Sequence, residues 1–136
     1  MESIREISNV PFDKIEIGQS AEMSVTLTKS QVDMLALVSG DADAFHFEGG
    51  ASLARSELQK VEAIAAEAIL SAVIGIKLPG PGSRILSQSL AYKGDIHTGD
   101  TVTAAVSVRQ KQIEGAVVVL DGRCTNQYGD ELVTGT

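Results

Sequence analysis

Apolar and polar residues alternate along most of the second half of the chain, which is the pattern of strands with one buried face. A shorter stretch near the N-terminus, residues 22–28, alternates in the same way and places Met23, Val25 and Leu27 on one face. Glycine-containing turns keep the later connections at hairpin length, which favours antiparallel pairing. The predicted strands of the second half cover residues 84–93, 101–110, 116–126 and 131–134.

Two stretches have the three-to-four-residue apolar spacing of helices. The first begins near Ser30, where Asp33 completes a sequence that resembles a capping box, and Gly40 is a suitable C-terminal stop. The second extends from about residue 52 to residue 77 and is apolar on almost every side in its second half. A helix of that kind is enclosed by other elements. The Pro- and Gly-rich residues 78–82 end it.

These elements predict an α+β fold in which one antiparallel sheet wraps around one long buried helix. At 136 residues the chain has the length of a single domain, which we assign to residues 1–136. Residues 1–20 are expected to form an irregular arm. The strand pattern is still in progress at Thr136, so we expect a domain truncated at its C-terminus or cut from a larger protein.

Composition narrows the classes of partner and location. The formal net charge of −7 weighs against nucleic acid or an anionic membrane as partner. The N-terminus lacks the apolar region of a signal peptide, and the longest apolar run, from Val61 to Ile76, contains Glu62 and Glu67 and is too short to cross a bilayer comfortably. We therefore expect a cytoplasmic protein. The only cysteine, Cys124, cannot form an internal disulfide and is expected to be a small core residue.

The best chemical lead is the pair Asp41 and His46, which stand five positions apart in VSGDADAFH. A carboxylate and an imidazole at that spacing can hold one water between a base and an acid. Taken singly, Asp41 could be a solvated or capping carboxylate, and His46 a half-buried histidine with its ring satisfied. The other histidine, His97, falls in a predicted turn and is expected to face solvent. The titratable residues show no metal-ligand spacing, so no metal site is expected.

The order of these motifs resembles that of the MaoC-like hot-dog domains, which include the (R)-specific enoyl-CoA hydratases. The resemblance rests on SGDADAFHF before the buried helix, LPGPG after it and YKGDIHTGDTVTAAVSV beyond, and it covers nearly the whole chain from about Phe12. The tail LDGRCTNQYGDELVTGT is most similar to the MaoC domain fused to phosphate acetyl- or butyryltransferases. The resemblance implies a hot-dog fold, a homodimer whose sheets join edge to edge, and an acyl-CoA thioester as substrate.

The resemblance also implies a site. Family members add water to trans-2-enoyl-CoA to give the (R)-3-hydroxyacyl-CoA, and Asp41 and His46 correspond to the dyad that grips the water. A backbone N–H near the start of the central helix would receive the thioester carbonyl, and Ala63 corresponds to that position when residues are counted back from LPGPG. Ser71 aligns with a small polar residue near the acyl or pantetheine pocket. No cofactor is implied beyond the CoA of the substrate.

Two substitutions depart from the family pattern. Asp43-Ala44 replaces the family's Asn-Pro, and an ionised Asp43 can only accept hydrogen bonds where asparagine also donates them. Glu62-Ala63 stands where relatives have His-Gly at the head of the central helix. If that helix began near Leu53, the Ala63 N–H would be bonded within the helix and could not face a ligand.

These departures leave two other functions open besides hydration. One is a catalytically impaired MaoC domain that binds acyl-CoA or scaffolds a phosphate acyltransferase. The other is a hot-dog thioesterase that uses Glu62 or Glu67 of the central helix as its carboxylate. Three basic residues could contact CoA phosphates, although solvation at the surface is the simpler expectation: Lys77, Arg84 and Lys93.

Overall fold

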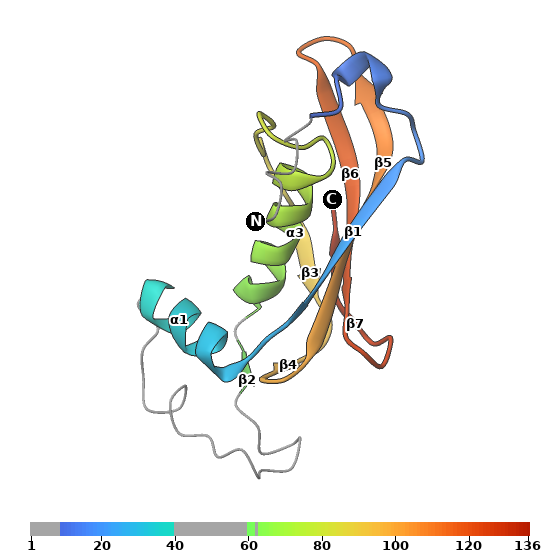
Figure 1. Cartoon of the computed structure of the whole chain (residues 1–136). Coiled ribbons are helices and arrows are strands. Elements are labelled where there is room, and N and C mark those ends of the chain that lie inside the picture. The colour runs from blue at the N-terminus through green and yellow to red at the C-terminus, as the bar shows by residue number, and fades with distance from the viewer. Residues whose placement is uncertain (1–8, 40–59, 62) are drawn as a thin grey trace, which may run out of the picture.

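The computed structural model describes residues 9–39, 60–61 and 63–136, which form a curved antiparallel sheet around one central helix (Figure 1). This arrangement confirms the predicted α+β class. The elements in chain order are the 3-10 helix η1 (Phe12–Lys14), β1 (Ser20–Thr26), α1 (Lys29–Ser39), β2 (Lys60–Val61), α3 (Ile64–Ile76), β3 (Leu90–Tyr92), β4 (Ile96–His97), β5 (Thr101–Gln112), β6 (Val117–Thr125) and β7 (Glu131–Gly135).

Five strands form the main sheet in the order β1-β5-β6-β7-β3, and every neighbouring pair is antiparallel. Side chains of β5 alternate between the helix side and the outer face, as the sequence pattern predicts. On the outer face, hydroxyl groups of β1 and β5 pair across the strands, with Ser24 Oγ 2.7 Å from Thr103 Oγ1 and Thr26 Oγ1 2.8 Å from Thr101 Oγ1. The inward side chains of β5 are buried: Val102, Ala104, Val106 and Val108.

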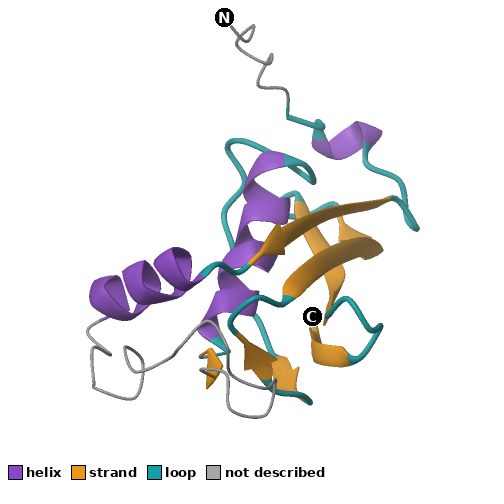
Figure 2. Ribbon diagram, turned by 60° about the horizontal axis from the view of Figure 1, so that its bottom comes forward, coloured by secondary structure: helices purple, strands orange, loops and turns teal. Residues whose placement is uncertain are grey.

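The helix α3 lies against the concave face of the sheet (Figure 1, Figure 2). Small residues allow the close contact: Ala66 is fully buried, and its carbonyl oxygen is 3.7 Å from the thiol sulfur of Cys124 on β6. Gly122 of β6 faces Leu70, and a Cβ built at Gly122 would lie 3.4 Å from a Leu70 methyl group. The buried residues of α3 are Ala65, Ala66, Ile69, Leu70 and Val73.

The prediction of one continuous helix from about residue 52 to residue 77 is wrong at residues 60–61. Residues 60–61 form β2, which pairs with β4, and α3 begins only at Ile64. Val61 and Ile96 lie opposite each other in this pair and are both buried. Burial of these two side chains outweighs the local helix propensity, which is a weak force by comparison. Residues 52–59 lie outside the described part of the chain.

The strand predicted over residues 84–93 is assigned only at Leu90–Tyr92. One more backbone pair extends it, because Ser89 donates to and accepts from Thr136 at 2.8 and 3.0 Å. Residues 83–88 have no strand assignment. Among them, Ile85 and Leu86 are 42% and 64% exposed. β3 is therefore a short edge strand of the main sheet, and the residues before it carry apolar side chains on the surface.

The helix α1 lies on the opposite side of α3 from the sheet in both views (Figure 1, Figure 2). Its capping box begins two residues earlier than predicted. The Thr28 N–H donates to Gln31 Oε1 at 3.1 Å, and the Gln31 N–H donates to Thr28 Oγ1 at 3.3 Å. Asp33 instead accepts a hydrogen bond of 2.7 Å from the Lys29 ammonium group one turn away. These contacts fix where α1 starts relative to the end of β1.

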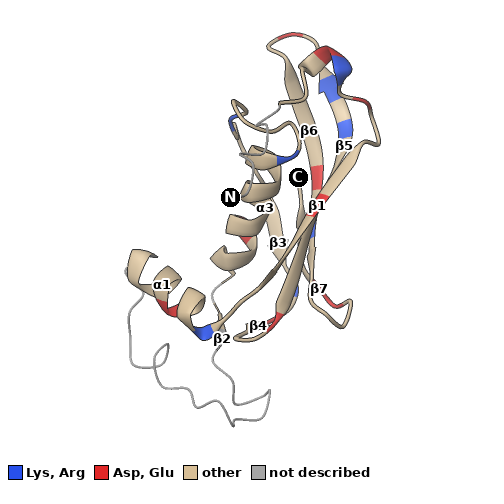
Figure 3. Ribbon diagram, in the orientation of Figure 1, with Lys and Arg blue, Asp and Glu red and all other residues tan. Residues whose placement is uncertain are grey.

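Charged residues are spread over the strands and turns, whereas α3 carries only Glu67 (Figure 3). Such a helix suits an enclosed position, as its sequence predicts. None of the helices in the described ranges is long and apolar enough to cross a membrane.

Candidate active site at the start of α3

The first turn of α3 presents backbone donors. Ala63 precedes the helix with φ −58° and ψ −21°, and its carbonyl oxygen accepts from the N–H groups of Ala66 at 3.0 Å and Glu67 at 3.4 Å. Because residues 60–61 are a strand, no helical turn precedes Ala63, and its N–H is not consumed by an i→i−4 bond. The positive end of the helix dipole lies at the same place. This arrangement removes the objection that Ala63 is inside a longer helix.

Most of the other residues predicted for the site lie outside the part of the chain that the structure describes. Asp41, Asp43, Ala44, His46 and Glu62 all lie outside the described residues. Along the chain, the first four fall in the connection between α1 and β2. The assignment of Asp41 and His46 to the water, and that of Asp43 to orientation, therefore stay predictions.

Ser71 lies on α3 eight residues beyond Ala63, about 12 Å along the helix axis. Its side chain is exposed, on the face of α3 that also exposes Ile64 and Ala68. Its place near an acyl or pantetheine pocket stays a prediction.

A cavity of about 890 Å³ opens between the C-terminal half of α3, the hairpin of β5 and β6, and residues 82–90. Its size falls within the usual range of small-molecule sites. Seryl and glutaminyl side chains and Arg84 lie along the segment that forms one wall. The floor is apolar and includes Leu70, Ile74, Leu90, Val106 and Leu120.

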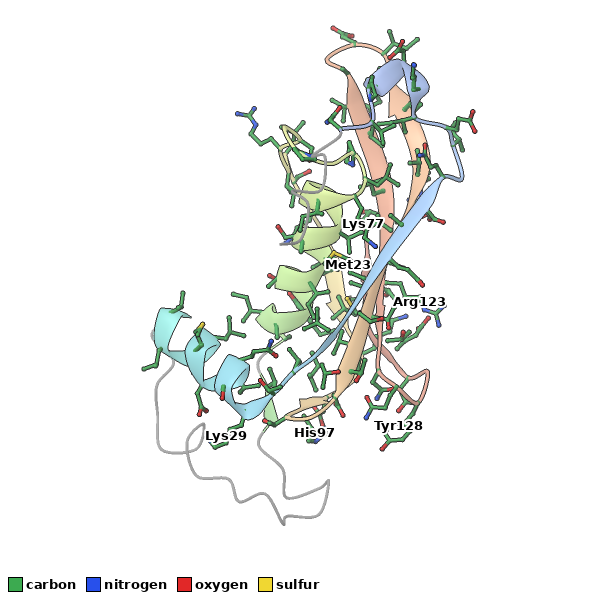
Figure 4. All side chains as sticks on the ribbon, viewed as in Figure 1. Met23, Lys29, Lys77, His97, Arg123 and Tyr128 are labelled. Atoms are coloured by element: carbon green, nitrogen blue, oxygen red, sulfur yellow. The ribbon has the colours of Figure 1, made fainter. Side chains whose placement is uncertain are left out.

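The turn from His97 to Asp100 connects β4 to β5, and Figure 4 labels His97. The expectation that His97 faces solvent is wrong, because it is part of β4 and its side chain is only 14% exposed, with Nδ1 3.9 Å from Asp100 Oδ2. Asp100 is 1% exposed, and sequence reasoning missed it. The available signal was an Asp after Gly99, placed directly before the strongest alternating strand.

Two of the three basic residues considered for CoA phosphates contact the protein itself. The ammonium group of Lys77 (labelled in Figure 4) donates to the carbonyl oxygen of Glu22 at 2.7 Å. The Lys93 ammonium nitrogen lies 3.4 Å from a Glu131 carboxylate oxygen. Arg84 is exposed and lines the cavity. Of the three, Arg84 is therefore the best placed to meet a ligand.

Metal and thiol chemistry find little support within the described ranges. There, no three His, Cys, Asp or Glu side chains gather as a metal site would require. Cys124 is fully buried, as predicted, and burial raises its pKa to about 11. A thiol of this kind is protonated at neutral pH and is a poor nucleophile.

No model of a known protein family matches the chain. An (R)-specific enoyl-CoA hydratase of Rhodospirillum rubrum is 34% identical over 115 residues, which cover 84% of this chain and 80% of the relative. The chain belongs to the (R)-specific enoyl-CoA hydratase family. A second hydratase of this family, from Aeromonas caviae, is 32% identical over 89% of this chain and 91% of its own length.

Solved structures of the family agree with the fold. The R-hydratase PhaJ1 of Pseudomonas aeruginosa, in unliganded form, superposes with a TM-score of 0.86 at 29% identity, over 93% of this chain and 82% of that one. The (R)-hydratase of A. caviae has a TM-score of 0.80 over 89% of this chain and 92% of that one. The MaoC-like hot-dog identification is therefore confirmed. The particular similarity to domains fused to phosphate acyltransferases stays a prediction.

The raised pKa of Cys124 predicts a pH-dependent loss of stability. Between about pH 9 and pH 11 the unfolded thiol loses its proton while the folded thiol keeps it, so the free energy of unfolding falls by about 1.4 kcal/mol per pH unit. Urea unfolding of the wild type and Cys124→Ala at pH 8 to 11 measures this, because only the wild type carries the thiol contribution. The stability difference between the two proteins should change across that range; a constant difference would contradict the assignment.

Proposed function

We propose that this protein is an (R)-specific enoyl-CoA hydratase, which adds water to a trans-2-enoyl-CoA and catalyses the reverse dehydration. The observation that carries the proposal is the start of α3 at Ile64, which leaves the Ala63 N–H outside the helical bonding pattern in a chain of this family. A relative from Methylorubrum extorquens, 29% identical, is named 3-hydroxybutyryl-CoA dehydratase, which is the same chemistry in reverse.

The proposed reaction adds one water molecule across the C2–C3 double bond of the enoyl group, with one proton transfer from the water and one to C2. One member of the pair Asp41 and His46 takes a proton from the water, and the water oxygen forms a bond to C3 of the enoyl group. The π electrons of the C2–C3 bond shift toward the thioester, whose carbonyl oxygen becomes negative and accepts a hydrogen bond from the Ala63 N–H. The other member of the pair gives a proton to C2. Because no electrons are exchanged with a second reactant, we expect no cofactor besides the CoA of the substrate.

The apolar cavity supports an acyl thioester as the ligand class. Its floor along Leu70 and Ile74 begins about two turns of α3 beyond Ala63, which is the direction an acyl chain would follow from a thioester at the helix start. Two large core residues of α3, Ile69 and Val73, point into the main core and do not line the cavity. Arg84 at its wall is suited to an anionic group of CoA.

We further propose a homodimer and a cytoplasmic location. The edge formed by residues 83–92 presents Ile85, Leu86 and Tyr92 at 42%, 64% and 52% exposure, which is costly unless a partner covers them. A second copy could continue the sheet along this edge. The single cysteine, which cannot form an internal disulfide, supports a reducing compartment.

The activity is tested by adding crotonyl-CoA and following the absorbance of the conjugated enoyl thioester, which disappears on hydration. Asp41→Asn and His46→Gln should each lower kcat by about 100- to 10,000-fold, because each removes one proton-transfer group. Chiral analysis of the product should give the (R)-alcohol. Release of free CoA thiol instead would indicate a thioesterase, and an unchanged enoyl absorbance with the fold intact would indicate an impaired acyl-CoA-binding domain.

The amide donor is tested with Ala63→Pro. The φ of −58° at Ala63 suits proline, and proline is favoured where a helix begins, so the variant should remain folded. It lacks the N–H, and we expect kcat to fall by about 100- to 1000-fold. Ala63→Gly keeps the N–H and serves as the control, with kcat expected within about tenfold of the wild type. Full activity of a folded Ala63→Pro variant would rule out this donor.

The dimer is tested by light scattering after size exclusion. The wild type should have twice the 14.3 kDa mass of one chain. Leu86→Lys places an ammonium group in the proposed apolar interface and should shift the protein to the monomer mass. Ile113→Lys changes an apolar residue that is 89% exposed on the β5–β6 turn, away from this edge, and should leave the dimer intact. A monomeric wild type, or equal behaviour of the two variants, would contradict the proposed interface.

A further inference from the structure

Asp100 is a buried carboxylate that the proposed reaction does not use. It is 1% exposed, at the start of β5. One carboxylate oxygen accepts from the backbone N–H of His97 at 2.9 Å, and the other accepts from Gln127 Nε2 at 3.0 Å. Gln127 in turn accepts from the Thr101 N–H through Oε1 at 3.0 Å. Burying a carboxylate is costly unless hydrogen bonds such as these compensate for its lost hydration.

The backbone of the same turn holds the chain where it leaves β1. The Leu27 N–H donates to the carbonyl oxygen of Asp100 at 2.8 Å, and the Gly99 N–H donates to the carbonyl oxygen of Leu27 at 2.7 Å. Gly99 has a φ of +93°, which an L-residue with a side chain rarely adopts. Thr28 follows Leu27 and caps α1. The turn therefore fixes the start of the helix that leads, along the chain, to Asp41 and His46.

The other side of the turn holds the chain that enters α3. His97 and Ile96 of β4 pair with Lys60 and Val61 of β2, and Ala63 follows two residues later. Two of these residues are core residues, since Val61 and Ile96 are 7% and 2% exposed. The Asp100 N–H also donates to the carbonyl oxygen of His97 at 3.0 Å, which closes the turn. The position of the Ala63 N–H therefore depends on β4, and β4 depends on Asp100.

We infer that Asp100 is a positioning residue, which holds β4 through the His97 N–H and so sets the position of the Ala63 amide that follows β2. This inference rests on the proposed function for its effect on the rate. The turn from His97 to Asp100 bonds to Leu27 before α1 and, through β4, to β2 before Ala63. A rigid support of this kind is required because small displacements of a hydrogen-bond donor strongly reduce stabilisation of a transition state.

A carboxylate is needed because it must accept from two N–H groups at once. In Asp100→Asn, one oxygen becomes an NH₂ group, which faces either the His97 N–H or the Gln127 Nε2 donor and cannot accept from it. Exchanging the roles should repair this: in the double variant Asp100→Asn with Gln127→Glu, the new amide can donate to the new carboxylate while still accepting from the His97 N–H. The double variant also keeps the total charge. Gln127 is exposed, so a carboxylate there is tolerated.

The experiment measures amide hydrogen exchange over residues 60–63 and 96–99 together with steady-state hydration of crotonyl-CoA. For Asp100→Asn we expect faster exchange in both segments and a fall in kcat of about 10- to 100-fold, with KM within about threefold, because only the transition state depends on the exact place of the donor. The double variant should recover most of both quantities. Gln127→Ala removes the hydrogen bond that the exposed Gln127 side chain donates to Asp100, and it should give a smaller change in exchange and kcat in the same direction. This variant tests the inference even if Asp100→Asn does not fold.

The control is Val108→Ala, a core truncation at the far end of β5 that should lower stability without changing exchange over residues 60–63 or kcat. A folded Asp100→Asn or Gln127→Ala variant with unchanged exchange in both segments would overturn the inference, as would a double variant no better than Asp100→Asn alone. The exchange measurement needs no substrate. A wild type without hydratase activity would therefore refute the proposed function separately, while the exchange data still decide whether Asp100 holds β2.

Discussion

The close approach of α3 to β5 and β6 depends on small residues on both sides of the contact. Ala66 and Cys124 meet at the centre, and Gly122 leaves room for Leu70. Each aliphatic side chain buried around this contact contributes about 1.5–3 kcal/mol. Because the helix cannot slide along a packed surface without losing these contacts, its axis is fixed relative to the sheet. The place where its first turn meets β2 follows from that constraint.

Much of this architecture could be predicted from the sequence because its signals are local. The alternation in residues 101–110 indicates burial on one face, and the almost uncharged second half of the helix indicates enclosure; both features are present in the structure. The start of α3 could not be predicted in this way. Helix-forming residues before Glu62 suggested continuation, whereas the pairing of Val61 with Ile96 joins positions 35 residues apart, and no local pattern reports such a contact.

The same limit applies to the candidate site. Asp41, His46 and Ala63 could be proposed from motifs, because those motifs stand at fixed distances in the sequence. Asp100 could not, because its importance lies in the bonds its carboxylate and backbone make to Leu27, His97 and Gln127. His97 was misjudged for a related reason: residues 94–99 have the composition of an exposed turn, but two of them form a strand against β2. The composition of a turn indicates its backbone conformation but not which distant segment packs against it.

The residue before α3 has a thermodynamic consequence. Most helices begin with a side chain that accepts from the first N–H groups, and replacing such a residue with alanine costs about 0.5–2 kcal/mol. Here the position is occupied by alanine itself, which has no atom able to do this. A thioester oxygen bound to the Ala63 N–H would add a hydrogen bond at this helix start, which has no side-chain cap. Occupancy of the site and resistance to unfolding would then be linked, and bound substrate would help to maintain the folded population of the enzyme that consumes it.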